Sequence, residues 1–197
     1  HTRLQGDWSS DVCSSDLGNS TISGASFVDS FDVSGQDAAP IDISFNNDGT
    51  KMFVLGNAGK DVNEYTLSTG FDVSTASFVD SFSVNSQETS PKSISFNNDG
   101  TKMFILGSQG YDVNEYTLST GFDVSTASFV DSFDVSSNAS NPQAVTFNND
   151  GTKMFVTDTF NKNVNEYTLS TSFDVSTASY DSNFSVSSQD GNPFDIT

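Results

Sequence analysis

A nine-residue phrase recurs three times in this chain of 197 residues. It reads Phe-Asn-Asn-Asp-Gly-Thr-Lys-Met-Phe and occupies residues 45–53, 96–104 and 147–155, so that successive copies start 51 residues apart. A repeat of this length indicates one supersecondary unit that stacks on copies of itself. Each unit must then have the same fold and must bury one face against its neighbour. The repeat therefore constrains the fold more than any other feature.

Each unit contains four short segments with strand character. In the first whole unit Ile43 and Phe45 alternate with polar residues, and Asn-Asn-Asp-Gly then predicts a tight hairpin. The next segment, residues 52–55, is apolar without interruption, so both of its faces must be covered. Residues 62–67 form a third segment, and a half-buried fourth begins with the phrase Ser-Phe-Val-Asp-Ser-Phe. Copies of this phrase start at 26, 77 and 128, and an altered copy starts at 179.

Four short strands in an antiparallel meander, with no helical period, predict an all-β fold. Sheets of this kind that pack face to face around an axis make a β-propeller. The alternative is a parallel β-solenoid, but its coils are usually shorter and do not need the repeated hairpin. We therefore expect residues 18–197 to form a partial, open propeller of about 3.5 four-stranded blades. The expected repeat units are 40–90, 91–141 and 142–192, with partial blades at both ends and further blades outside this chain.

The N-terminal segment differs from everything after it. Residues 7–17 resemble the translation of a sequencing adapter, and residues 1–17 contain the chain's one His, one Arg, one Trp and one Cys. We interpret residues 1–17 as an artefactual or disordered segment and exclude it from the fold. The segment has no apolar stretch typical of a signal peptide.

The phrase Phe-Asn-Asn-Asp-Gly-Thr-Lys-Met-Phe-Val resembles the Ser-Pro-Asp-Gly-Thr element of bacterial propeller repeats. These repeats include the Tyr-Val-Thr-Asn type and lactonase-like seven-bladed propellers. The resemblance extends over residues 18–197 and implies the propeller architecture. It does not imply one function, because the element recurs in enzymes, sensors and surface proteins. The present unit is longer than the usual 40 to 45 residues.

Composition excludes several kinds of chemistry. The formal charge of −19 disfavours nucleic acid and anionic lipid as partners, and no apolar run approaches the length of a membrane span. Without His, Cys or Arg after residue 17, the chain has no Ser-His-Asp or Cys-His system, no His/Cys zinc site and no sialidase-like arginine cluster. Most carboxylates recur in every unit, which is typical of a structural role. We therefore predict no catalytic residue here.

The repeated hairpin also raises the question of calcium. Asn46, Asn47 and Asp48 offer the hard oxygen ligands that calcium prefers, yet the hairpin lacks the Asp-x-Asp-x-Asp-Gly pattern. Side chains that bond their own turn explain these residues without metal. Asp72, ahead of Ser74, is similarly expected to cap a local turn. We predict no cofactor, with calcium as the alternative.

Two connections in each unit vary between copies, while the other two barely change. The connection before the proline changes from Gln-Asp-Ala-Ala at 36–39 to Gln-Glu-Thr-Ser at 87–90, and residues 57–60, 108–111 and 159–162 also differ. Alternate connections of a meander lie on the same side, so the varied loops are expected to share one face. Because binding residues are concentrated on loops held by a rigid scaffold, we predict a partner-binding face; neutral drift in exposed loops is the competing explanation. Its candidate residues are Asn57, Lys60, Gln109, Tyr111, Phe160 and Lys162.

The sequence thus predicts a non-catalytic binding or structural propeller module of a larger secreted or surface protein, bacterial or viral. Its partner would be a protein or a glycan. The alternative is a piece of a propeller hydrolase or lactonase-like enzyme whose catalytic residues lie outside this chain.

Overall fold

The computed structural model describes residues 26–196, and the segment interpreted as an adapter lies outside them. The described part forms three four-stranded antiparallel sheets, each a simple meander. The first sheet contains β1 (Pro40–Phe45), β2 (Lys51–Gly56), β3 (Asp61–Leu67) and β4 (Ala76–Ser83). The second contains β5 (Pro91–Phe96), β6 (Lys102–Gly107), β7 (Asp112–Leu118) and β8 (Ala127–Asp134), and the third β9 (Pro142–Phe147), β10 (Lys153–Asp158), β11 (Asn163–Leu169) and β12 (Ala178–Ser185).

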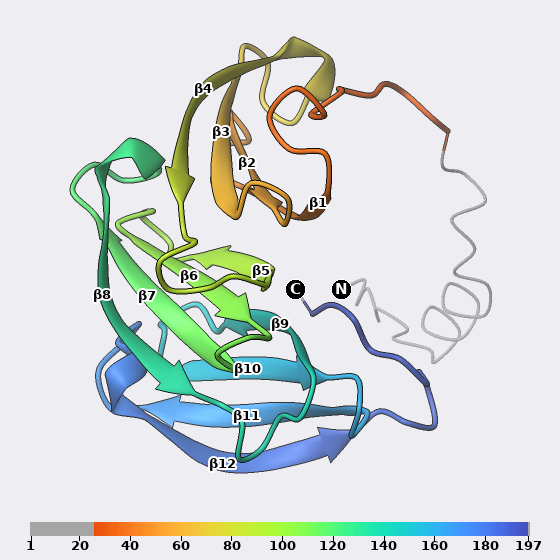
Figure 1. The fold of residues 1–197 in the computed structure, drawn as a ribbon, viewed down its shortest axis with the longest axis vertical. Helices are drawn as coiled ribbons and strands as arrows, with labels where there is room; N and C mark the ends of the chain where they lie inside the picture. Colours follow the sequence, from red (N-terminus) through yellow and green to blue (C-terminus); the bar gives the residue numbers. More distant parts are fainter. Residues whose placement is uncertain (1–25, 197) are drawn as a thin grey trace, which may run out of the picture.

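The three sheets are arranged radially (Figure 1), with β1, β5 and β9 towards the centre and β4, β8 and β12 at the rim. Side chains link successive inner strands: Ile94 N donates to Asp42 Oδ2 at 2.8 Å, and Val145 N donates to Ser93 Oγ at 3.3 Å. The sheets do not close into a ring. The predicted all-β fold, an open partial propeller of four-stranded antiparallel blades, is confirmed.

The second strand of the middle sheet, β6, packs against another sheet on both of its faces, as the uninterrupted apolar run predicted, because Phe104 joins the third sheet and Met103 joins the first. Phe53 and Leu55 of β2 join Met103 and Ile105 of the second sheet in one buried cluster. The preceding Met52 and the intervening Val54 lie on the opposite face of β2, in a separate cluster. This alternation follows from the pleat, since successive side chains point to opposite faces of a strand. Burial between sheets therefore supplies most of the core.

The repeated Asn-Asn-Asp-Gly phrase forms the predicted tight hairpin between β1 and β2. Asn46 Oδ1 accepts from Lys51 N at 2.9 Å, and Asp48 Oδ1 accepts from Thr50 N at 3.0 Å. Gly49 has a φ of 70°, and the ring of Phe71 lies where a Cβ would stand. The turn therefore requires glycine for its conformation and for the space that the ring occupies.

The connection from β3 to β4 contains a short 3-10 helix, η1 (Val73–Thr75), which recurs as η2 (Val124–Thr126) and η3 (Val175–Thr177). Asp72 caps the first of them, because its Oδ1 accepts from Ser74 N at 3.1 Å. The predicted local capping role of Asp72 is confirmed. Within the described residues no helix is long and apolar enough to cross a membrane.

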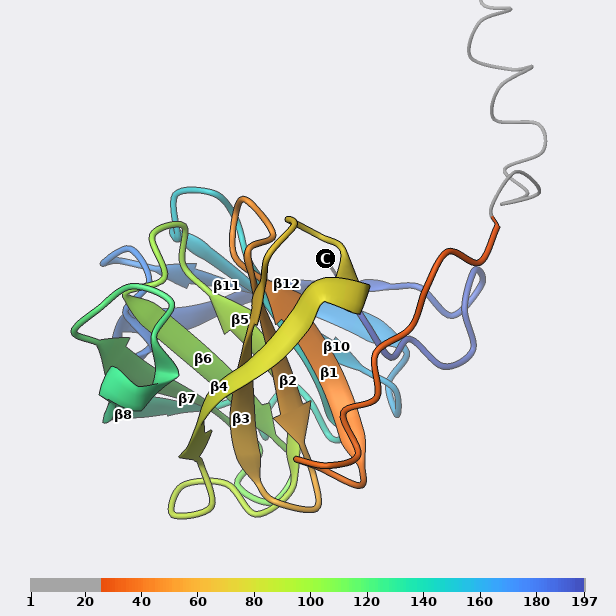
Figure 2. The same cartoon turned by 90° about the horizontal axis from the view of Figure 1, so that it is seen from above.

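The outer-strand prediction needs two corrections. The phrase at 77–84 forms most of β4 as predicted, but its residues are largely exposed rather than half-buried. The copy at 26–33 does not form a strand. The difference is one of pairing, since β4 bonds to β3 whereas residues 26–33 pair with no strand among the described residues. Figure 2 shows this segment running beside β1, and its residues Phe31 and Val33 pack against the buried cluster on the open face of the first sheet.

Candidate binding face of variable loops

The two varied connections of each sheet lie side by side. Asn57 N donates to Ala39 O at 3.0 Å, and Val84 N donates to Lys60 O at 2.9 Å, so that loop 57–60 bridges the connections on either side of it. The uniform loops meet at the opposite ends of the strands, where Phe71 N donates to Gly49 O at 3.0 Å. The arrangement of loops expected from the sequence is therefore present. We call the surface formed by loops 34–39, 57–60, 85–90, 108–111, 136–141 and 159–162 the variable-loop face.

The six candidate residues occupy three equivalent positions of loops 57–60, 108–111 and 159–162. Phe160 is 73% exposed, and Tyr111 is 37% exposed. Asn57, Gln109 and Lys162 are exposed, and Lys60 is half-buried. The structure thus gathers all six on one face.

Lys60, Tyr111 and Lys162 end their loops in the left-handed region, with φ of 54°, 54° and 57°. This conformation is uncommon for residues other than glycine and costs about 1–2 kcal/mol. It directs each carbonyl group towards the next connection, where Lys60 O accepts from Val84 N and Tyr111 O accepts from Val135 N at 2.8 Å. The loops are therefore held in a defined shape while their side chains vary.

A buried carboxylate lies beneath each pair of variable loops, and sequence reasoning missed it. Asp37, which is 3% exposed, accepts from Ala39 N and Gly59 N at 2.6 Å each. In the second sheet Glu88 is fully buried and accepts from Ser90 N and Gly110 N. Each carboxylate joins two loops by hydrogen bonds to backbone N–H groups, which makes the face rigid.

In the third sheet the carboxylate comes from the strand β10 and not from the loop before the first strand. Ala139 occupies the place equivalent to Glu88, and Asp158 occupies the place equivalent to Gly107. Asp158 is fully buried, and it accepts from Asn141 N at 3.0 Å and Phe160 N at 2.9 Å. The acid and the small residue have exchanged places, while the bridge between the loops is kept. Alignment of the three units at these two positions would have shown the exchange.

The electrostatics of the face combine buried acids with two lysines. Burial raises the pKa of Asp61 and of Asp112, and the neighbouring charges of Asp37 and Glu88 respectively add to the effect. Within residues 26–196 Lys60 and Lys162 take part in no ion pair, unlike Lys51, Lys102 and Lys153. The face therefore offers ammonium groups as well as the exposed rings of Tyr111 and Phe160.

The central axis is a second concave region. Two adjoining pockets of about 330 and 390 Å³ lie between β1, β5, β9 and residues 194–196. Burial raises the pKa of Asp42 there, and the charge of Asp195 adds to the effect. Among the described residues no group of three or more His, Cys, Asp or Glu side chains is placed to hold a metal ion. In the hairpin Asp48 Oδ1 accepts a hydrogen bond from Thr50 Oγ1 at 2.6 Å, which is the bond within the turn that the sequence predicted.

Comparison with protein-family models and with curated proteins finds no match. Solved structures do match. A candidate 6-phosphogluconolactonase of Bacteroides fragilis superposes with a TM-score of 0.55 at 14% identity, over 75% of this chain and 39% of that one. The periplasmic gluconolactonase of Pseudomonas aeruginosa superposes with a TM-score of 0.50 at 12% identity, over 74% and 38% of the two chains. The Cps50 (Swd1) β-propeller domain of Myceliophteria thermophila superposes with a TM-score of 0.50 at 10% identity, over 75% of this chain and 43% of that one.

These identities show the fold alone. The chain spans about two fifths of the length of the structures that it matches. The comparisons therefore agree with the radial sheets described above, and the chain has the β-propeller fold.

Proposed function

We propose that this chain is a non-catalytic binding module, part of a secreted or surface protein, that recognises a protein or a glycan through its variable-loop face. The observation that carries the proposal is the uneven variation between units. The second and third strands, the hairpins and the 3-10 turns repeat almost unchanged, whereas the exposed loop residues of one face vary between blades. The inner strands also vary, with Ile41-Asp42 replaced by Lys92-Ser93 and by Gln143-Ala144. A set of rigid loops with different side chains is the arrangement that specific recognition requires.

The chemistry of the face supports a polar partner that also contacts aromatic rings. Tyr111 and Phe160 provide exposed rings, and tyrosine supplies contact area at a low cost in conformational entropy. Lys60 and Lys162 provide positive charge in a chain of net charge −19. An acidic peptide segment and an anionic sugar both fit this combination.

The alternative is a hydrolase or lactonase-like enzyme whose catalytic residues lie outside this chain. Its support is the likeness to lactonase structures, which at 12–14% identity concerns the fold alone. Among the described carboxylates Asp42 has a distinguishing position, because it lines the axial pockets and its equivalents are Ser93 and Ala144, but no described His or Cys accompanies it. The binding role is therefore the better supported of the two.

Two probes test the proposal: a glycan array and a displayed random-peptide library, each presented to the whole chain. Binders are expected from one of them, and the variant Tyr111→Asn/Phe160→Ser/Lys162→Asn should reduce their affinity at least tenfold by calorimetry. Asn tolerates the left-handed conformation, so the fold should be kept. The matched control Val79→Ser/Val130→Ser changes exposed outer-strand residues and should leave affinity unchanged. Failure of both probes, or binders that are insensitive to the triple variant, would refute the proposal.

A further inference from the structure

The first and third sheets each present one broad face that no other sheet covers. The first-sheet face contains Ile43, Phe45, Val54, Phe71 and Val73. The third-sheet face contains Lys153, Phe155, Val164, Glu166 and Phe184. These two surfaces are equivalent to the two halves of the interface that the structure forms twice within itself.

Each internal interface is built around three aromatic rings. Phe53 of the first sheet lies 4.6 Å from Phe96 and 6.1 Å from Phe122 of the second, measured between ring centroids. The next interface repeats the arrangement, with Phe104 at 4.3 Å from Phe147 and 6.3 Å from Phe173. One ring comes from the preceding sheet and two from the following sheet.

A buried ion pair accompanies each ring cluster. Lys51 Nζ lies 2.6 Å from Glu64 Oε1 and also donates to Phe122 O at 2.6 Å. The other oxygen, Glu64 Oε2, accepts from Val124 N at 2.9 Å. Lys102 and Glu115 make the same bonds to Phe173 O and Val175 N. The pair thus fastens the first turn of the following 3-10 helix.

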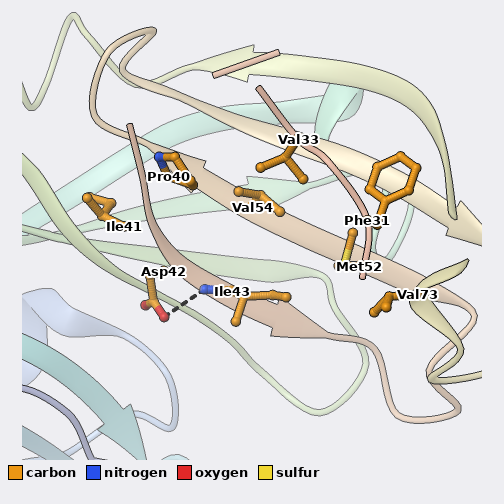
Figure 3. A pocket seen from close by; sticks show the side chains of 9 residues that line it. All are labelled: Phe31, Val33, Pro40, Ile41, Asp42, Ile43, Met52, Val54 and Val73. Carbon is orange, nitrogen blue, oxygen red and sulfur yellow. Dashed lines mark hydrogen bonds between the residues drawn. The ribbon is translucent and has the colours of Figure 1, made fainter. Parts of the chain in front are cut away.

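The first-sheet face is the receiving half of such an interface. Phe45 and Phe71 form the two-ring pair, with centroids 5.5 Å apart, but no ring from a preceding sheet joins them in the described part of the chain. A cavity of about 340 Å³ lies on the same sheet face, with Ile43, Met52 and Val54 on the side of the sheet and Phe31 and Val33 on the other (Figure 3). In the next interface the equivalent residues Ile94, Met103 and Ile105 pack against Phe53 and Leu55.

The third-sheet face is the inserting half. Phe155 is equivalent to Phe53 and Phe104, and it lines an open pocket of about 320 Å³ together with Val164 and Phe184. Phe184 is 70% exposed, whereas its equivalents Phe82 and Phe133 pack edge-on against tyrosines of the following sheet. Lys153 and Glu166 lie 2.7 Å apart, and the side chain of Glu166 is 35% exposed, compared with 2% for Glu115.

We propose that a second copy of this chain docks head to tail, with the third-sheet face of one copy against the first-sheet face of the other. Phe155 of one copy completes the ring cluster of Phe45 and Phe71 in the other. Lys153 and Glu166 bond Phe71 O and Val73 N, as Lys51 and Glu64 bond the second sheet. A second copy is the occupant because its two faces carry the rings and the ion-pair residues equivalent to those of the internal interfaces. One difference is that Lys153 also pairs with Asp181, whose equivalents are Val79 and Val130, so this bond has to break on docking.

Docking requires residues 26–33 and 193–196 to move from their present positions. Neither segment forms a strand. Phe31 lies edge-on to Tyr65 at 5.5 Å, in the geometry of Phe82 on Tyr116. Phe184 of the docked copy is the equivalent residue and replaces Phe31 there. Residues 193–196 lie at the axis, where the docked β1 would enter. Two copies bring six sheets together, within the four to eight blades of known propellers.

Sedimentation velocity on the whole chain tests the proposal. The wild type is expected to associate as concentration rises. Ile43→Asp, on the first-sheet face, and Phe155→Asp, on the third-sheet face, should each stay monomeric alone. Because each variant keeps one intact face, their equimolar mixture should form a 1:1 heterodimer and nothing larger. Such complementation identifies a heterologous interface.

Phe184→Asp provides a second third-sheet variant at a more exposed position, in case Phe155→Asp fails to fold. Val130→Asp, on the exposed outer strand β8, is the control and should associate as the wild type does. A wild type that remains monomeric at all concentrations would refute the proposal and leave further repeat units as the occupant. Association that persists in either single-face variant, or a mixture without heterodimer, would also refute it.

Discussion

Glu88 and Gly107 share one buried space, because the carboxylate of Glu88 lies where a side chain on Gly107 would have to stand. In the third sheet the pair is reversed, with Ala139 and Asp158 at the equivalent positions. Both arrangements place one carboxylate beneath the variable-loop face. The relationship predicts which substitutions the face tolerates.

The double variant Glu88→Ala/Gly107→Asp reproduces the third sheet in the second. Glu88→Ala alone removes the acceptor of two loop N–H groups, and an unsatisfied buried donor costs about 1–3 kcal/mol. Gly107→Asp alone forces two carboxylates into one space and should lower the unfolding free energy by about 2 kcal/mol or more. The double variant should recover most of the loss, with a coupling of about 1–3 kcal/mol in urea unfolding. Additive losses would contradict the exchange.

The ion pair of Lys102 with Glu115 lies between two sheets, and the equivalent pair of Lys153 with Glu166 lies on an open sheet face, so the two can be compared. Glu115 is 2% exposed, so Lys102→Met leaves a buried carboxylate unpaired. The expected loss is about 3 kcal/mol, the low end of the range for broken buried pairs, because Lys102 itself is 25% exposed. Lys153→Met should lower the unfolding free energy much less than Lys102→Met does, since its partners are a third exposed. The measurement is chemical unfolding at dilutions where the chain is monomeric, and equal losses would contradict the account.

Asp112→Asn should stabilise the protein at neutral pH. Burial raises the pKa of Asp112 in the folded state, so the charged form is disfavoured there, and the third sheet has Asn163 at this position. The folded state binds the proton more readily than the unfolded state, and the wild type therefore loses stability as pH rises from the ordinary pKa through the raised one. The gain from Asp112→Asn should be largest at pH 7 and shrink on acidification towards pH 4. Asp131→Asn removes the same charge from an exposed site, and an equal gain there would contradict burial as the cause.

Gly100→Ala tests the conformation of the hairpin. Gly100 has a φ of 70°, and a Cβ there would overlap the ring of Phe122. The left-handed conformation alone costs about 1–2 kcal/mol for alanine, and the overlap adds to it. Gly35→Ala is the matched control, because nothing lies within 4 Å of the added Cβ. Its thermal midpoint should change little, and an equally small change for Gly100→Ala would show that the hairpin does not need glycine.

Much of the fold follows from the repeat and from local patterns. The apolar run at Met52 predicts a strand between two layers, and the Asn-Asp-Gly phrase predicts the hairpin, because both signals are local and recur in each unit. Alternation of connections in a meander then assigns Lys60, Tyr111 and Phe160 to one face. These inferences need no knowledge of distant contacts.

The buried carboxylates could not be recognised in the same way. Asp37 and Glu88 lie in polar loops, where an acid is usually solvated, and their burial depends on N–H groups of another loop. The conformation of residues 26–33 was also outside the reach of local pattern, since a strand needs a partner to pair with. In both cases the deciding contact is distant in sequence.

The account's central claim is that a rigid propeller scaffold presents its ligand site on the variable-loop face. The most direct measurement is amide chemical-shift mapping by NMR with a binder selected from the peptide library or the glycan array. The account predicts perturbed amides in loops 57–60, 108–111 and 159–162, with the hairpins at 46–50, 97–101 and 148–152 unchanged. Perturbation confined to those hairpins, with the variable loops unchanged, would contradict it.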